Sequence, residues 1–251
     1  MSRATPRLRM FAGPNGSGKS TIKEVLEPEL LGTYINPDEI EKSIRVSGCL
    51  DLSAFGVETT ENEVLPFFRN SSFLANEGFS EAASLLRFYS DTLVFDACPV
   101  NAYFASVCAD FIRHKLLDKD VTFTFETVMS SYDKVELLKK AQEKGYRTYL
   151  YYVATEDPAI NVSRVENRVK AGGHSVPPDK IESRYYRSLD NLADAVLYAN
   201  RAYIFDNSSH EKVWIAEVTD GDELELKTEL MPFWFKTALW DKFVSSEESA
   251  P

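Results

Sequence analysis

The chain has 251 residues, of which 44% are hydrophobic and 27% are charged, a size and composition typical of one generous α/β domain. Its formal charge of −11 at pH 7 and its pI of about 4.9 argue against long nucleic acid as a partner, although a local basic pocket for phosphates is compatible with them. No apolar run approaches ~18 residues, and no apolar core follows the basic residues near the start. We therefore expect no membrane contact, no signal peptide and a cytoplasmic location.

The stretch GPNGSGKST is the first informative feature in chain order, because it fits the phosphate-binding pattern GxxxxGK[ST]. An apolar run at 8–12 precedes it as a buried strand, and residues 21–26 have the composition of a helix start. In such a loop, backbone N–H groups converge on phosphate oxygens, the lysine reaches the β- and γ-phosphates, and the serine holds Mg²⁺. We assign nucleotide binding to the whole stretch: Gly13, Pro14, Asn15, Gly16, Ser17, Gly18, Lys19, Ser20 and Thr21.

Strands and helices alternate along the rest of the chain. Strands are expected at 33–35, 121–125, 147–153 and 203–205, and helices at 132–144, 157–170 and from 178 to about 199. This order predicts an α/β fold with a doubly wound, mostly parallel sheet, similar to P-loop small-molecule kinases, whose ligand crevice lies at the carboxyl ends of the strands.

Two parts of the chain depart from the alternation. Residues 50–120 read as a mostly helical insertion, whose clear element is a helix at 101–117. Residues 211–251 read as an appended hairpin around Asp220-Gly221 and an aromatic helix at 233–243. We expect one P-loop kinase domain over residues 1–251 that carries both additions.

Two acidic residues follow predicted strands and are candidates for the reaction chemistry. Asp38 follows the second strand in YINPDEI, where Asn36 and Glu39 are good helix-capping residues, so that capping does not require the Asp38 carboxylate. Asp38 is therefore available for a catalytic role at the crevice. Glu126 ends a strongly apolar strand, where a buried carboxylate needs a partner, so it either faces the crevice or forms a structural ion pair.

Two arginines, Arg164 and Arg168, lie one helical turn apart in RVENR and share a face. The pair matches the phosphate-clamping lid of small-molecule kinases, and a solvated helix face is the alternative.

These segments together resemble the zeta toxin family. The resemblance rests on GPNGSGKST, YINPDEI, the strand ending in FETVMSS, the stretch RVENRVKAGGHSVPPDKIESRYYRSLDNL and the following YIFDNS, which together cover about two thirds of the chain. It implies ATP-dependent phosphorylation of the 3′-hydroxyl of UDP-N-acetylglucosamine, with ATP and Mg²⁺ as cofactors and a small helical antitoxin as a possible partner.

The resemblance also implies roles for individual residues. Lys19 and Ser20 would bind ATP and Mg²⁺, and Asp38 would be the base toward the sugar hydroxyl. Glu126 and Thr127 would hold substrate or metal, and Arg164 and Arg168 would close the lid. Known members carry a second lid arginine shortly before a proline, whereas this chain has His174 at the corresponding place, which we expect to contact phosphate.

Two other functions stay open. A kinase of another small metabolite or nucleotide would need the same parts, because the acceptor is chosen by the insertion and the crevice wall. The sequence is less compatible with a non-catalytic NTP-binding regulator. It has no guanine-reading NKxD tetrapeptide, and it retains the residues expected for catalysis, Lys19, Ser20, Asp38 and Glu126.

Overall fold

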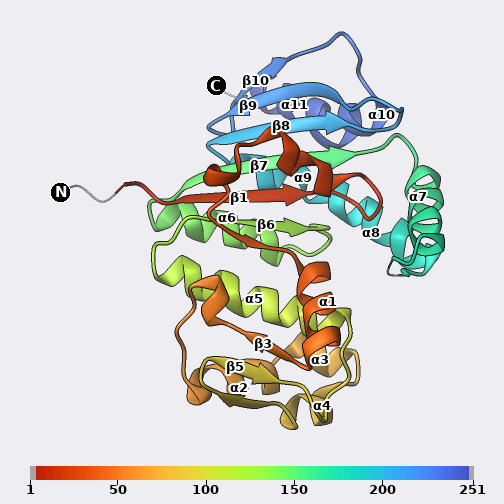
Figure 1. Ribbon diagram of the computed structural model, residues 1–251. Helices are drawn as coiled ribbons and strands as arrows, with labels where there is room; N and C mark the ends of the chain where they lie inside the picture. Colours follow the sequence, from red (N-terminus) through yellow and green to blue (C-terminus); the bar gives the residue numbers. More distant parts are fainter. Residues whose placement is uncertain (1–3, 174, 249–251) are drawn as a thin grey trace. The chain divides into compact units, whose positions relative to one another are not determined.

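The computed structural model describes residues 4–173 and 175–248 (Figure 1). The chain divides into two compact units, one made of residues 1–30 and 126–251 and the other of residues 31–125. The expectation of one domain over residues 1–251 stays a prediction. No helix in the described part of the chain is long and apolar enough to cross a membrane.

A mostly parallel, seven-stranded sheet takes strands from both units, which confirms the predicted α/β fold class. The first unit holds five of them in the order β10-β9-β8-β7-β1, with β1, β7 and β8 parallel and β9 and β10 added antiparallel at one edge. The bounds are β1 Arg7–Ala12, β7 Arg147–Ala154, β8 Arg201–Asp206, β9 Val213–Thr219 and β10 Glu223–Leu226. Strand β6, Phe123–Thr127, begins in the second unit, where it pairs in parallel with β2, Thr33–Ile35.

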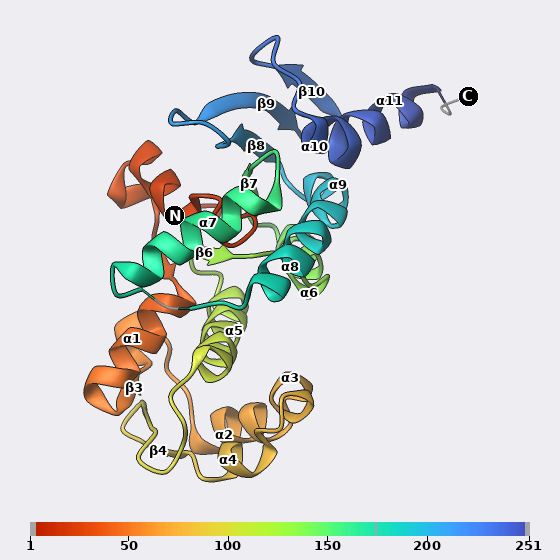
Figure 2. The same ribbon diagram turned by 90° about the vertical axis from the view of Figure 1, so that its right-hand side faces the viewer.

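The helices of the first unit bury one face each. Their bounds are α6 Asp133–Glu143, α7 Pro158–Lys170, α8 Pro178–Asp190 and α9 Leu192–Leu197. Helix α6 packs against β7 and α9, and α7 lies beside α8 (Figure 2). The single helix expected from 178 to about 199 was wrong, because α8 and α9 are separated at Asn191, whose side-chain amide donates to the Met129 carbonyl at 3.0 Å.

The C-terminal part contains the predicted hairpin. Asp220 and Gly221 have φ of 50° and 83°, both in the left-handed region that tight hairpin turns use, and together with Asp222 they connect β9 to β10. The aromatic helix expected at 233–243 forms as one helical run with a π-helical interior: α10 Phe233–Phe235 continues through η4 Lys236–Trp240 into α11 Asp241–Glu248. The indole N–H of the buried Trp234 donates to Oδ2 of Asp206 at 2.7 Å.

The second unit is less helical than its sequence pattern indicates. Helix α5, Ala102–Asp118, forms as expected with Asn101 as its N-cap. Three short strands make an antiparallel sheet in the order β3-β5-β4, which the helical pattern of 50–120 did not predict. The other elements of the unit are α1 Pro37–Ser47, β3 Cys49–Asp51, η3 Ser53–Phe55, α2 Glu61–Arg69, α3 Ser72–Asn76, α4 Ser80–Ser84, β4 Arg87–Tyr89 and β5 Thr92–Val94.

Candidate functional site

The phosphate-loop motif lies between β1 and a 3₁₀ helix, η1, Lys19–Val25. The helix start expected at 21–26 falls in this short 3₁₀ helix, which does not continue because the chain returns to an extended conformation at Leu26 and reaches Pro28, which disfavours helical backbone just before it. Lys19 folds back over the loop, where its Nζ donates to the carbonyls of Gly13 and Pro14, both at 2.8 Å. The lysine ammonium is therefore held at the loop by two backbone acceptors.

Two glycines of the loop pack against residues that the sequence did not single out, Gly16 against the backbone of Asn161 and Gly18 against the side chain of Asn207. Gly16 has φ of 76°, and a Cβ there would come within 2.6 Å of the Asn161 carbonyl oxygen. Gly18 has φ of 95°, and a Cβ there would lie 2.4 Å from Nδ2 of Asn207. Both positions thus require glycine for backbone conformation and for space.

Ser20 and Glu126 meet, although 106 positions separate them in the sequence: the Ser20 hydroxyl donates to Oε2 of Glu126 at 3.1 Å. Glu126 is buried at the end of β6, with 6% of its surface exposed, and Ser20 is exposed at the start of η1. A hydroxyl and a carboxylate side by side are oxygen ligands of the kind that Mg²⁺ uses together with phosphate oxygens. Among the described residues, no group of three or more His, Cys, Asp or Glu side chains forms a metal cage on its own.

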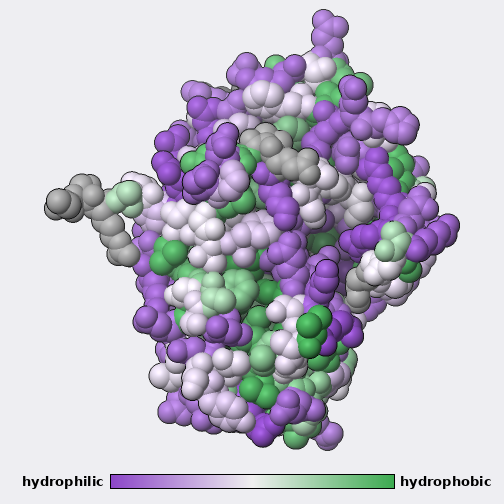
Figure 3. Space-filling model, viewed as in Figure 1, coloured by the Kyte–Doolittle hydropathy of each residue, from purple (hydrophilic) through white to green (hydrophobic). Residues whose placement is uncertain are grey.

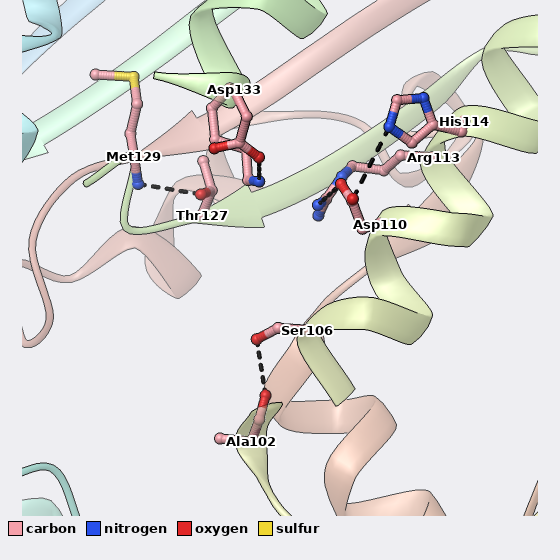
Figure 4. Close-up of polar contacts among 9 residues, drawn as sticks. Ala102, Ser106, Asp110, Arg113, His114, Thr127, Met129 and Asp133 are labelled. Atoms are coloured by element: carbon pink, nitrogen blue, oxygen red, sulfur yellow. Dashed lines mark hydrogen bonds and ion pairs between the residues drawn. The ribbon is translucent and has the colours of Figure 1, made fainter. Parts of the chain in front are cut away.

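Thr127 follows Glu126, and its hydroxyl accepts the backbone N–H of Met129 at 3.0 Å (Figure 4). Met129 has φ of 56°, so this bond helps to hold a tight turn at the end of β6. Thr127 therefore shapes the turn after the strand in this structure.

The same figure shows a separate cluster on α5, made of Asp110, Arg113 and His114. The Asp110 carboxylate accepts from Arg113 at 2.7 Å and lies 3.9 Å from His114 Nε2.

The two predicted lid arginines lie on α7, which starts with Asp157 as its N-cap, as expected. Arg164 donates from Nη1 to the Asn207 carbonyl at 2.7 Å and from Nη2 to the Ser209 carbonyl at 3.3 Å. Arg168 is exposed one turn further on, against Gly173. Arg164 is thus bound to the loop between β8 and β9.

Asp38 belongs to the second unit, in the first turn of α1, and is exposed. Asn36 caps this helix as predicted, because its Oδ1 accepts from the N–H groups of Asp38 at 2.8 Å and Glu39 at 3.4 Å. His174 lies outside the described residues. Arg187, on the neighbouring helix α8, donates from Nε to the Ser183 carbonyl of its own helix at 3.4 Å.

Three polar side chains support the loop and were missed by sequence reasoning. Asn161 and Asn207 donate to loop carbonyls, and Lys212 Nζ donates to Thr21 Oγ1 at 2.7 Å. The sequence offers one signal for these residues: Asn207 directly follows a strand that ends in an acid, within the segment YIFDNS that resembles the zeta toxin family.

The site fits a nucleotide phosphate on two observations. Its glycines leave no room for side chains where the loop closes. Two polar atoms of the loop, Asn15 Oδ1 and Ser17 Oγ, are buried without a hydrogen-bond partner among the residues described. Buried polar groups are rarely left unsatisfied, so both atoms indicate that the loop is built around polar contacts beyond those inside the protein.

Comparison with known proteins bears on this site directly. The model of the zeta toxin family matches residues 95–219, a span that contains β6, α7, β8 and β9 and ends at the turn between β9 and β10. This chain is zeta-toxin-like. The matched span includes Glu126, Arg164 and Asn207, whereas the phosphate loop and Asp38 lie outside it.

One relative and two solved structures are also similar to this chain. An uncharacterized protein of Haemophilus influenzae is 27% identical over 111 residues, which are 43% of this chain and 79% of that protein. A native structure of the AvrRxo1-ORF1:ORF2 complex matches with a TM-score of 0.53 and 16% identity over 90% of this chain and 62% of that chain. A structure of the same complex with ATP matches with a TM-score of 0.51 and 15% identity over 98% and 66%.

This chain therefore spans less than two thirds of the length of the solved chains. At such identities the likeness to these solved structures shows the fold alone.

Proposed function

We propose that this protein is an ATP-dependent phosphotransferase that acts on an alcohol group, and that its acceptor is the 3′-hydroxyl of UDP-N-acetylglucosamine. The observation that carries the proposal is the hydrogen bond between Ser20 and Glu126, because it joins the end of a phosphate loop to a buried carboxylate at the end of a sheet strand. A loop that only bound nucleotide would not need this carboxylate, whereas phosphoryl transfer depends on metal support beside the phosphates.

Each residue has a proposed task. Lys19 exchanges its two loop carbonyls for phosphate oxygens and follows the charge that develops on the transferred group. Ser20 and Glu126 would hold Mg²⁺, which supplies neutralising charge beside the phosphates when bound. Asp38 accepts the proton of the acceptor hydroxyl, which suits an exposed carboxylate in the first turn of a helix. Arg164 and Arg168 contribute cations to the phosphates from α7.

The acceptor and the partner rest on the zeta toxin likeness. The AvrRxo1-ORF1:ORF2 complex has been solved with ATP, which supports ATP as the donor here. It is also a complex of two different chains, which supports a second, small protein as a partner of this one. The family match leaves out residues 1–94, which include Asp38, so a different small-molecule acceptor is the alternative that an assay must separate.

The test is a mass-shift assay with purified protein, ATP and Mg²⁺ against UDP-N-acetylglucosamine, other UDP-sugars, nucleosides and simple sugars. We expect one phosphate, about 80 Da, to be added to UDP-N-acetylglucosamine at its 3′-position, and no addition with the Lys19→Ala variant. Phosphorylation of another compound in place of the UDP-sugar would refute the acceptor and keep the enzyme class. ATP binding without transfer to any acceptor would support a nucleotide-binding regulator.

A further inference from the structure

Two asparagine side chains from outside the phosphate loop hold two of its backbone carbonyls. Nδ2 of Asn161 donates to the carbonyl of Asn15 at 2.6 Å, and Nδ2 of Asn207 donates to the carbonyl of Ser17 at 2.7 Å. We infer that Asn161 and Asn207 are positioning residues that set the conformation of the phosphate loop for the nucleotide. The inference rests on the proposed function only in that ATP is the ligand of this loop.

Asn161 is fixed in the first turns of α7. It is fully buried, and its Oδ1 accepts the hydroxyl of Thr155, so that the orientation of its amide is determined. The carbonyl of Thr155 in turn accepts the hydroxyl of Tyr185 at 2.6 Å. Burial raises the pKa of Tyr185, so its hydroxyl stays protonated and able to donate. Asn161 is therefore a rigid donor whose side chain is oriented from both sides.

Asn207 is fixed at the end of β8 by bonds from its own backbone. Its N–H donates to the Ala154 carbonyl at 2.9 Å, and its carbonyl accepts Nη1 of Arg164 at 2.7 Å. The same residue thus contacts strand β7, the arginine of α7 and the carbonyl of Ser17. A small displacement of any of these elements would change the position of the amide that holds the loop.

The geometry of the peptide plane explains why these two contacts matter for phosphate binding. In a trans peptide the carbonyl of one residue and the N–H of the next point in opposite directions. Because the Asn15 carbonyl is held by Asn161, the N–H of Gly16 is turned to the other side of the loop. In the same way, holding the Ser17 carbonyl turns the N–H of Gly18 away from Asn207. Loop N–H groups are the donors that such a motif offers to phosphates.

The test uses three variants of the full chain that each replace a side-chain amide by a carboxylate: Asn161→Asp, Asn207→Asp and, as the matched control, Asn191→Asp. Asn191 also donates from Nδ2 to a backbone carbonyl, that of Met129, but this contact is separate from the loop. Kd for ATP is measured by calorimetry, and unfolding temperature is measured with and without ATP.

We expect Asn161→Asp and Asn207→Asp to weaken ATP binding at least about tenfold, because each leaves a carbonyl facing an acceptor. Asn191→Asp should lower the unfolding temperature while it keeps the Kd of the unchanged protein. If a carboxylate prevents folding, Asn161→Ala and Asn207→Ala remove the donor without adding charge and should also weaken binding. In active preparations, KM for ATP should rise more than KM for the acceptor.

The outcomes separate this inference from the proposed function. Folded Asn161 and Asn207 variants with an unchanged Kd for ATP would overturn the inference, as would a Kd that rises equally in the Asn191 control. An unchanged protein that binds ATP but transfers no phosphate would refute the proposed function and leave the inference to be decided by the variants. An unchanged protein that binds no ATP would overturn both.

Discussion

The hydroxyl of Ser20 donates a hydrogen bond to Oε2 of Glu126 at 3.1 Å, which joins the end of the phosphate loop to the end of strand β6. If the pair holds Mg²⁺, both oxygens must be present for tight metal binding. We expect Ser20→Ala and Glu126→Gln each to raise the Mg²⁺ concentration for half-maximal activity at least about tenfold. The measurement is a Mg²⁺ titration of initial rates, with Glu223→Gln on β10 as the control. An unchanged Mg²⁺ requirement in both variants would limit Glu126 to a structural role.

The ammonium group of Lys19 donates to two carbonyls of the phosphate loop. Lys19→Ala should lower the rate of phosphoryl transfer at least ~100-fold, the range for removal of one preorganised electrostatic contact. Initial rates at saturating ATP measure this, after circular dichroism has established that the variant is folded. Near-normal turnover in a folded variant would argue against a kinase.

Asp38→Asn should keep ATP binding and abolish transfer, since the amide preserves shape and loses the basic carboxylate. Glu39→Gln is the matched control, because both residues are exposed acids in the first turn of α1 and both favour its N-terminus. Calorimetry with ATP and the transfer assay are run in parallel. Loss of ATP binding together with transfer would assign Asp38 to metal support instead.

Arg164→Ala and Arg168→Ala should each lower transfer, by about tenfold or more, because charged hydrogen bonds to phosphate are lost. Arg184→Ala on α8 should have a smaller effect. Arg164→Ala should in addition weaken the β8–β9 loop, because Arg164 donates to the carbonyls of Asn207 and Ser209. The comparison of kcat and KM for the three variants measures this, and equal losses would extend the lid to α8.

Glu63 gives a prediction for stability against pH. Lys115 and Thr59, with the backbone N–H of Thr60, hold the pKa of this carboxyl down to about 2. Because the folded-state pKa is lowered, this stabilisation is complete above the unfolded pKa of about 4.5 and is lost as pH falls toward 2. The unfolding temperature of the unchanged protein should fall between pH 5 and pH 2, and we expect Lys115→Met to make this fall smaller. The reduction should be about half of the fall or less, because the ion pair is partly solvated. The same slope in both proteins would show that the pair is fully screened.

The elements that the sequence predicted best are those set by residues close to one another in the chain. Helices α1, α5 and α7 begin where Asn36, Asn101 and Asp157 stand as N-caps, because a capping side chain acts on the backbone only two or three residues away. The hairpin at Asp220 was equally local, since it depends on two residues with positive φ.

Features that depend on distant partners could not be read from the sequence in the same way. Strands β3, β4 and β5 have three residues each, too few for a periodic pattern, and their pairing is decided by tertiary contacts. The bonds of Asn161 and Asn207 to the loop join residues 146 and 190 positions apart. By contrast, the carboxylate of Glu126 was foreseen as a candidate because burying an acid at a strand end requires a partner, although its partner Ser20 was not.

The hydrogen bond from Trp234 to Asp206 has a consequence for how the chain can be cut and recombined. Asp206 also accepts the N–H of Ser208 at 2.9 Å and its hydroxyl at 2.8 Å, so the same carboxylate shapes the turn that follows Asn207. The indole of Trp234, which follows strand β10, therefore helps to hold the carboxylate that stabilises this turn. An exchange of C-terminal segments between relatives will keep the turn intact only if the acid and the tryptophan are inherited together.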